Sequence, residues 1–317
     1  MTRINYGQRA VEGIISKEKV IILDKTVTNQ DFILAKKLTK FNDLPADGMI
    51  GLAFAELSEN LNTLVQSMAD AKVIKSATFS LFLGDNDFGR KEEKESSVII
   101  FGGNNIKKYS DDKSFTELNV FFSGYWSVIL TRMEIDGEQV KVSTRTAIFD
   151  SGINLLIGPP SDVLNVFSKV QKDNDCVLSD LLICECKDLD EFPVLEFVLD
   201  SKRFYVNPKE YVAKDKNTCY VLISSARVGV WLLGIPFLRS YYTDYNMEKR
   251  TVQLARSSSA SKVHPEKSAF WIIMLIILSV TLVTITGVLA RFYYLKRRES
   301  RVQSQNEERM ISLVPLT

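Results

Sequence analysis

The sequence predicts an all-β body that is followed by one membrane-spanning helix. Short segments rich in β-branched and aromatic residues recur through residues 1–256, whereas helical patterns cover only residues 62–71 and 160–170. Further along, residues 269–290 form a run of 22 residues without a charge, which is long enough to cross a bilayer as a helix. We therefore expect a β-rich domain with a C-terminal anchor.

Composition limits the classes of protein to which this chain can belong. With 45% hydrophobic and 25% charged residues, its 317 residues can bury a sizeable core and lie outside the range of disordered chains. Lys and Arg number 40 against 39 Asp and Glu, and this near-neutral charge gives no electrostatic reason to expect a nucleic acid partner. The one histidine, His264, lies in a polar stretch, and we interpret it as a solvated linker residue.

Strands are expected where β-branched and aromatic side chains gather between polar or glycine breaks. Four segments show this pattern most clearly: 20–27, 96–103, 125–130 and 197–206.

The flanks of the apolar run are those of a membrane anchor, although a buried core helix is the alternative. Aromatic residues mark both ends, Trp271 at one and Tyr293 and Tyr294 at the other. Five basic residues follow: Arg291, Lys296, Arg297, Arg298 and Arg301. Because basic flanks stay in the cytoplasm, we expect a single-pass type I protein whose body is luminal or extracellular, in the secretory or endolysosomal pathway or at the cell surface. The N-terminus lacks the apolar region of a signal peptide, so either the anchor directs insertion or the natural chain begins upstream.

Four cysteines fall in the part that is expected to be luminal: Cys176, Cys184, Cys186 and Cys219. An even number in an oxidising compartment favours two disulfides. Cys184 and Cys186 could instead bind a metal, but no histidine accompanies them, and we expect no metal. Spacing alone does not determine the pairing.

One segment, residues 147–163, joins an apolar strand to Asp150-Ser151-Gly152 and then to a second apolar run. Gly152 permits a tight turn that would present the Asp150 carboxylate. Such triplets are also common in ordinary turns, so by itself the segment is either a structural turn or a site of carboxylate chemistry.

In context, this segment resembles the second catalytic motif of the pepsin-like aspartic endopeptidases. Four other segments resemble parts of that family in the same order: residues 4–13 the flap hairpin, 46–54 an apolar-apolar-Gly step, 96–103 with 123–130 the crossing between lobes, and 230–255 the closing segment with Leu232-Leu233-Gly234. The resemblance implies a bilobal pepsin-like acid protease fold with an incomplete N-terminal lobe. The expected parts are a partial N-terminal lobe with the flap (1–113), a C-terminal lobe (114–256), a polar stalk (257–268), the transmembrane helix (269–290) and a cytoplasmic tail (291–317).

The resemblance also implies roles for single residues. Asp150 is expected as one of two catalytic carboxylates, and Cys186 as the disulfide partner of Cys219. The expected substrate contacts are Tyr6 and Gly7 on the flap and Gly152 and Ile153 on the opposite wall. Ile153 departs from the family pattern, because Thr or Ser is common there and its hydroxyl bonds the carboxylate. Arg9 near the flap tip either protrudes into the cleft or is a solvated turn residue.

The mechanism of this family needs two aspartates that share a proton, yet Asp-Thr/Ser-Gly occurs only at Asp150. Asp150 precedes Gly234 by 84 residues, and the same spacing counted back from Gly51 falls before Met1. We therefore expect the first aspartate, with a signal peptide, upstream of this chain.

Two functions from different classes follow. The first is a membrane-anchored aspartic-type endopeptidase that hydrolyses protein or peptide substrates, as a monomer and without a cofactor. The second is a non-catalytic pepsin-fold protein, a peptide-binding module or pseudoprotease, which the single aspartate and Ile153 favour. With one carboxylate, the chain as it stands is expected to be inactive.

Overall fold

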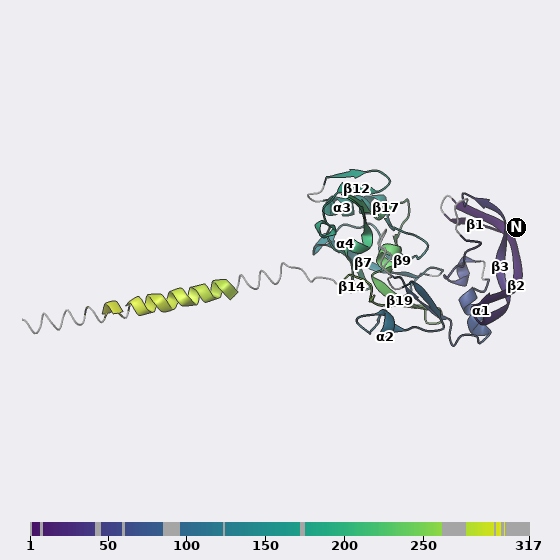
Figure 1. Cartoon of the computed structure of the whole chain (residues 1–317), viewed down its shortest axis with the longest axis horizontal. Coiled ribbons are helices and arrows are strands. Elements are labelled where there is room, and N and C mark those ends of the chain that lie inside the picture. The colour runs from purple at the N-terminus through teal and green to yellow at the C-terminus, as the bar shows by residue number, and fades with distance from the viewer. Residues whose placement is uncertain are drawn as a thin grey trace, which may run out of the picture. The chain divides into compact units, whose positions relative to one another are not determined.

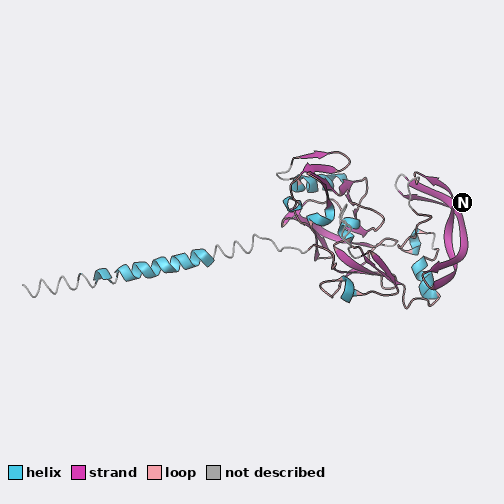
Figure 2. Ribbon diagram, viewed as in Figure 1, coloured by secondary structure: helices cyan, strands magenta, loops and turns pink. Residues whose placement is uncertain are grey.

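The computed structural model describes residues 2–6, 9–41, 46–58, 61–84, 96–122, 124–171, 175–261, 277–294, 296–298 and 301. The chain forms two compact units, Met1–Val263 and His264–Thr317. The first unit consists mainly of strands, drawn in magenta in Figure 2. The prediction of an all-β body is therefore confirmed.

Three antiparallel strands at the N-terminus form a sheet of their own: β1 (Thr2–Tyr6), β2 (Arg9–Ile22) and β3 (Lys25–Thr39) (Figure 1). The prediction of one strand over residues 20–27 is wrong, because the chain reverses inside this segment. Ile22 pairs with Lys25, and Leu23 between them has a left-handed φ of 53° and an exposed side chain. Leucine rarely takes this conformation, so the residue types give no sign of the turn.

A helix connects this N-terminal sheet to the rest of the first unit. Leu64 and Met68 of α1 (Leu64–Asp70) pack against Val27 of β3 in a small buried cluster. The hydroxyl of Thr63 caps the helix by accepting a hydrogen bond from the Gln66 N–H. A short 3-10 helix, η1 (Ala55–Leu57), precedes it. The predicted helical pattern at residues 62–71 is confirmed.

A second sheet combines early and late strands of the chain. Its order is β5 (Val98–Phe101), β4 (Thr78–Phe82), β19 (Tyr241–Asn246), β20 (Thr251–Arg256) and β6 (Thr116–Asn119), with α2 (Ile106–Tyr109) following β5 in sequence. Because β4 pairs with β19, this sheet joins the N-terminal and C-terminal parts of the first unit.

A third sheet carries the Asp-Ser-Gly segment. Its order is β14 (Lys202–Val206), β13 (Leu195–Leu199), β7 (Ser127–Ile135), β9 (Thr146–Phe149), β18 (Trp231–Leu233), β10 (Leu156–Gly158) and β17 (Ile223–Ser225), and β8 (Glu138–Val140) pairs with β7. The prediction of one strand over residues 197–206 is wrong, since it is a hairpin. Asp200 and Ser201 both have left-handed φ values, 46° and 64°, as a two-residue turn that matches the twist of a hairpin requires.

A fourth, smaller sheet has the order β11 (Cys176–Leu178), β12 (Leu182–Glu185), β16 (Thr218–Val221) and β15 (Val212–Asp215). The other helices are α3 (Pro160–Val170), η2 (Leu189–Glu191), α4 (Pro208–Tyr211) and α5 (Ile235–Leu238). The bounds of α3 confirm the predicted helix over residues 160–170.

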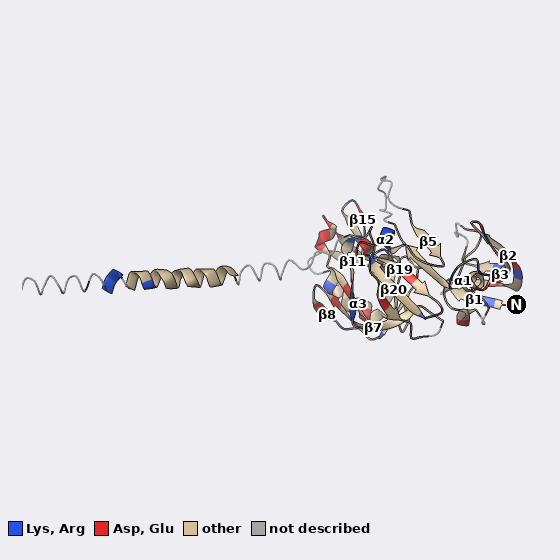
Figure 3. Cartoon of the chain, turned by 90° about the horizontal axis from the view of Figure 1, so that it is seen from below, with Lys and Arg blue, Asp and Glu red and all other residues tan. Residues whose placement is uncertain are grey.

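The second unit contains a helix, Ile277–Arg298, that is long and apolar enough to cross a membrane by length and composition. Figure 3 shows it tan over most of its length and blue toward its C-terminal end, where Lys296, Arg297 and Arg298 lie. Residues 269–276, with Trp271, lie outside the described residues, as does His264.

Candidate active site

Asp150 follows directly after β9, a strand that lies between two others. β9 pairs with β7 on one side and in parallel with β18 on the other. The Asp150 N–H donates to the Leu233 carbonyl oxygen at 3.1 Å, so the pairing with β18 continues one residue past the end of β9. The side chain is therefore held at the end of a fixed strand and is only partly buried.

The turn after Asp150 fixes one oxygen of its carboxylate. The Gly152 N–H donates to Asp150 Oδ1 at 2.9 Å. A Cβ atom added to Gly152 would lie 3.1 Å from the same oxygen, so a larger residue would crowd the carboxylate. The Asp-Ser-Gly triplet thus forms a turn that positions a carboxylate, which suits both interpretations of the motif.

Ile153 and Gly234 hold the far side of this turn. The Ile235 N–H donates to the Ile153 carbonyl oxygen at 2.9 Å. A Cβ on Gly234 would lie 2.5 Å from that oxygen and 2.3 Å from the carbonyl oxygen of Leu155. Only glycine leaves room for the two backbones to approach this closely. Ile153 contacts Gly234 also through its side chain.

Buried aromatic side chains support β9 near Asp150. The Phe149 N–H donates to the carbonyl oxygen of Trp126 at 3.0 Å, and the Trp126 ring contacts Tyr245 at 5.0 Å between centroids. Burial raises the pKa of the Tyr245 phenol, and the charge of Asp150 adds to the shift. The indole N–H of Trp126 donates to the Leu52 carbonyl oxygen at 2.8 Å, which links the site to the 46–54 segment.

The predicted flap is a hairpin. Tyr6 of β1 pairs with Arg9 of β2, whereas Gly7 and Gln8 lie outside the described residues. Tyr6 is 47% exposed, and its ring meets the Phe41 ring edge-on at 5.9 Å. The Arg9 guanidinium lies over the Phe41 ring at 5.5 Å. Within the described residues, no hydrogen bond or ring contact joins Tyr6 to Asp150. The structure thus brings Asp150, Gly152 and Ile153 together but places Tyr6 on a separate hairpin.

Asp162 is a positioning residue that no pattern in the sequence indicates. Its side chain is buried and accepts hydrogen bonds from the Ser143 N–H at 2.8 Å and the Trp231 indole N–H at 3.2 Å. It therefore ties α3 to β18, the strand beside Asp150. In sequence it resembles any acidic residue in the first turn of a helix, where the helix dipole favours negative charge.

The four cysteines form two disulfides. Cys186 bonds to Cys219, the pair that the resemblance implies, and Cys176 bonds to Cys184. Both bonds lie at the small sheet: Cys176 and Cys184 are opposite each other on β11 and β12, and the second bond joins Cys186, just after β12, to Cys219 on the neighbouring β16. No group of three or more His, Cys, Asp or Glu side chains within the described residues could hold a metal ion.

A carboxylate held by an Asp-Ser-Gly turn at the end of a buried strand, beside a glycine that follows a neighbouring strand, is the arrangement that the resemblance to the aspartic proteases implies. The chain belongs to the eukaryotic aspartyl protease family, whose model matches residues 1–257.

Similar proteins include pepsin A from Sus scrofa, with 28% identity over 265 residues, covering 80% of this chain and 65% of that protein. Pepsin A from Bos taurus is 27% identical over 261 residues, covering 80% and 68%. A protein named "Probable vacuolar protease A" from Trichophyton verrucosum is 28% identical over 272 residues, covering 80% and 64%. The chain thus spans about two thirds of the length of these relatives.

Proposed function

We propose that the protein is a membrane-anchored aspartic-type endopeptidase and that Asp150 supplies one of its two catalytic carboxylates. The observation that carries this proposal is the placement of Asp150, whose backbone is bonded to β18 and whose Oδ1 is held by the Gly152 N–H. The second carboxylate would come from sequence upstream of Met1, since the chain holds one Asp-Ser-Gly triplet.

Two facing carboxylates perform this hydrolysis because like charges at close range cannot both ionise. The ionised one takes a proton from a water molecule, whose oxygen attacks the scissile carbonyl carbon. The protonated one gives its proton to the carbonyl oxygen, and the amide nitrogen is protonated as the C–N bond breaks. Asp150 would be one member of this pair. Gly152 and Ile153 would line the substrate cleft, with Tyr6 and Gly7 on the flap.

The proposed membrane anchor and the proposed compartment are supported by separate observations. The apolar helix Ile277–Arg298 and the basic residues at its end support a single-pass anchor with a luminal or extracellular body. Two disulfides are compatible with an oxidising compartment. We retain the division into lobes at residues 1–113 and 114–256, a monomeric state, and protein or peptide substrates as parts of this proposal.

To test this proposal, the natural protein, with whatever sequence precedes Met1, is assayed for hydrolysis of an unfolded protein substrate at acidic pH. Asp150→Asn is expected to lower kcat by at least about 1,000-fold, because the pair loses one of its two carboxyl groups. The matched control is Asp180→Asn, an exposed aspartate outside the site, which is expected to leave kcat unchanged. Full activity of Asp150→Asn would refute the catalytic role.

Ile153 favours a second candidate, a non-catalytic peptide-binding protein, because isoleucine cannot donate a hydrogen bond to the carboxylate. Sequencing the transcript upstream of the Met1 codon and measuring the intact mass of the natural protein separate the two. An upstream Asp-Thr/Ser-Gly supports the endopeptidase. A stop codon upstream and an intact mass of 35.9 kDa would leave Asp150 as the single aspartate in an Asp-Thr/Ser-Gly motif, and would support the peptide-binding protein.

A further inference from the structure

The backbone pairing between β7 and the segment 138–146 is interrupted over a few residues that do not belong to the Asp150 turn. Met133 pairs with Val140, and the Leu130 N–H donates to the Arg145 carbonyl oxygen at 2.9 Å. Between these two contacts, residues 141–144 lie opposite only residues 131 and 132, so the two segments cannot pair residue by residue. A cavity of about 520 Å³ lies in this opening, lined by Thr131, Arg132 and residues 139–142 and 144–145.

The cavity carries positive charge without a carboxylate among its lining residues. Arg132, Lys141 and Arg145 all line it. Lys141 and Arg145 are exposed, and neither has an ion-pair partner in the part of the chain that the structure describes. Concave surfaces lined by one sign of charge concentrate the field and attract ligands of the opposite sign.

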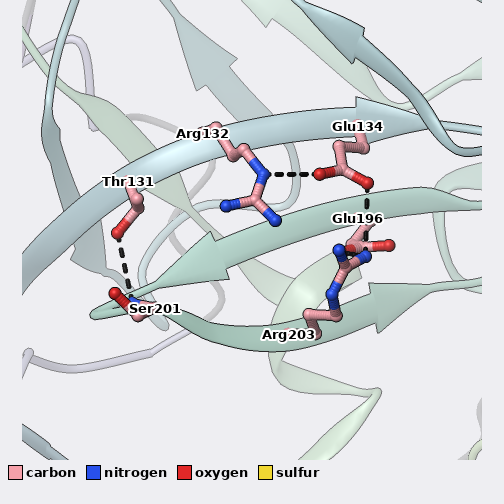
Figure 4. Close-up of polar contacts among 6 residues, drawn as sticks. All are labelled: Thr131, Arg132, Glu134, Glu196, Ser201 and Arg203. Carbon is pink, nitrogen blue, oxygen red and sulfur yellow. Dashed lines mark hydrogen bonds and ion pairs between the residues drawn. The ribbon is translucent and has the colours of Figure 1, made fainter.

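Arg132 is held in place by a nearly buried carboxylate. Its Nε donates to Glu134 Oε1 at 2.5 Å, and the Glu134 side chain is only 10% exposed. Arg203 contacts the other oxygen of Glu134 at 3.2 Å. Figure 4 draws no hydrogen bond or ion pair from the two terminal nitrogens of Arg132 to the other residues shown, and the Arg132 side chain is 33% exposed. The hydrogen bond from Arg132 lowers the pKa of Glu134, which keeps this anchor ionised.

The loop that carries the other two cations is also fixed. Three hydrogen bonds hold it: Ser143 N–H to Asp162 Oδ1 (2.8 Å), Asn165 Nδ2 to the Lys141 carbonyl oxygen (2.8 Å), and Thr144 Oγ1 to the Gly229 carbonyl oxygen (2.6 Å). A loop held in this way does not have to be ordered when a ligand binds, so less conformational entropy opposes binding.

We propose that this cavity binds the carboxylate side chains of an acidic polypeptide. A single inorganic oxyanion would occupy little of 520 Å³, whereas Lys141 and Arg145, together with Arg132 beside its partner Glu134, match several acidic groups along one chain. Val142, which is only partly buried, provides an apolar contact for the stem of a glutamate side chain. None of the lining residues belongs to the Asp150 turn, so binding does not require peptide hydrolysis.

The test measures binding to the full chain in detergent micelles by fluorescence anisotropy at low salt. The probe is a fluorescein-labelled peptide of alternating Glu and Ser residues, and the reference peptide has Gln in place of Glu. The Glu peptide is expected to bind at least about tenfold more tightly than the Gln peptide, because charge-assisted hydrogen bonds are the stronger ones.

Variants locate the binding site. The double variant Lys141→Glu/Arg145→Glu is expected to weaken binding of the Glu peptide by at least about tenfold. The matched control, Lys113→Glu/Lys249→Glu, makes the same change in net charge at two exposed lysines outside the cavity and is expected to leave binding within about twofold. If the first variant does not fold, Lys141→Gln/Arg145→Gln replaces it, with the same expected loss of binding.

Several outcomes would overturn the proposal. Equal binding of the Gln peptide, or equal weakening by the control variant, means that no acidic side chain is bound in the cavity. Displacement of the peptide by inorganic phosphate at the same concentration means a simple oxyanion site. An oligonucleotide of equal charge that binds as tightly as the Glu peptide means a general polyanion surface.

Discussion

Two segments of the chain share the pattern apolar-apolar-Gly, yet their surroundings are opposite. In Leu232-Leu233-Gly234, Leu233 is fully buried and two backbone oxygens lie within 2.5 Å of a Cβ added to Gly234. In Met49-Ile50-Gly51, Met49 is 51% exposed and Ile50 60% exposed. A Cβ added to Gly51 would meet no atom within 4 Å.

The difference shows that the apolar-apolar-Gly pattern alone does not determine whether the segment is buried, because burial depends on the strands that lie beside it. β18, which holds the first segment, lies between β9 and β10, both supplied by residues 146–158. In the described part of the chain, residues 49–51 form no strand and pair with none. The buried step therefore forms only where strands are present on both sides to cover it.

Truncation of the middle residue of each segment, Leu233 or Ile50, is expected to give the largest difference in stability. Leu233→Ala is expected to lower the free energy of unfolding by about 4 kcal/mol, because a fully buried leucine leaves a cavity. Ile50→Ala, at an exposed position, is expected to change it by less than about 0.5 kcal/mol. Urea unfolding in detergent micelles, followed by tryptophan fluorescence, measures both. Similar losses would show that residues 49–51 are buried in solution.

Substitution of the glycine gives the next contrast. Gly234→Ala is expected to cost about 3 kcal/mol, because the added methyl group overlaps the carbonyl oxygens of Ile153 and Leu155. Gly51→Ala meets no atom and serves as the matched control, with a change of less than about 0.5 kcal/mol. In the active natural protein, Gly234→Ala is also expected to lower kcat, since it displaces the turn that holds Asp150. A stable Gly234→Ala variant would contradict the close packing of β18 against this turn.

The sequence predicted the β9–turn–β10 unit and α3 because their patterns are local. An apolar strand, Asp-Ser-Gly and a Pro at the start of a helix each act through neighbouring residues. The turns at Leu23 and at Asp200 were missed, because both lie inside apolar or mixed runs that also fit a single strand.

Long-range partners could not be predicted from one sequence. The bond between Cys176 and Cys184 depends on the register of β11 against β12, and no spacing rule fixes a register. The hydrogen bonds of Asp162 depend on Trp231, which is 69 residues away. The resemblance implied the Cys186–Cys219 pair, but no residue pattern of this chain alone implies it.

The smallest expected effect concerns β19, through which the second sheet joins the N-terminal and C-terminal parts of the first unit. Asp244 of β19 is 7% exposed, its Oδ1 has no partner among the described residues, and burial raises its pKa to about 6, although a hydrogen bond with Asn104 opposes the shift. A carboxyl group with a raised folded-state pKa stabilises the fold fully below its unfolded pKa, near 3.8, and this contribution is lost as the pH rises to about 6.

We therefore expect the free energy of unfolding to fall by about 2 kcal/mol on account of Asp244 between pH 4 and pH 7. Burial raises the pKa values of Glu196 and Glu210 as well, so Asp244→Asn should remove only part of the pH dependence. Urea unfolding of the unsubstituted protein and of Asp244→Asn between pH 4 and pH 7 measures the difference in pH dependence. Asp111→Asn, which changes an exposed aspartate, is the control. An unchanged pH dependence in Asp244→Asn would mean that water reaches Asp244, and that the sheet joining the two parts is more open than β4 and β19 show.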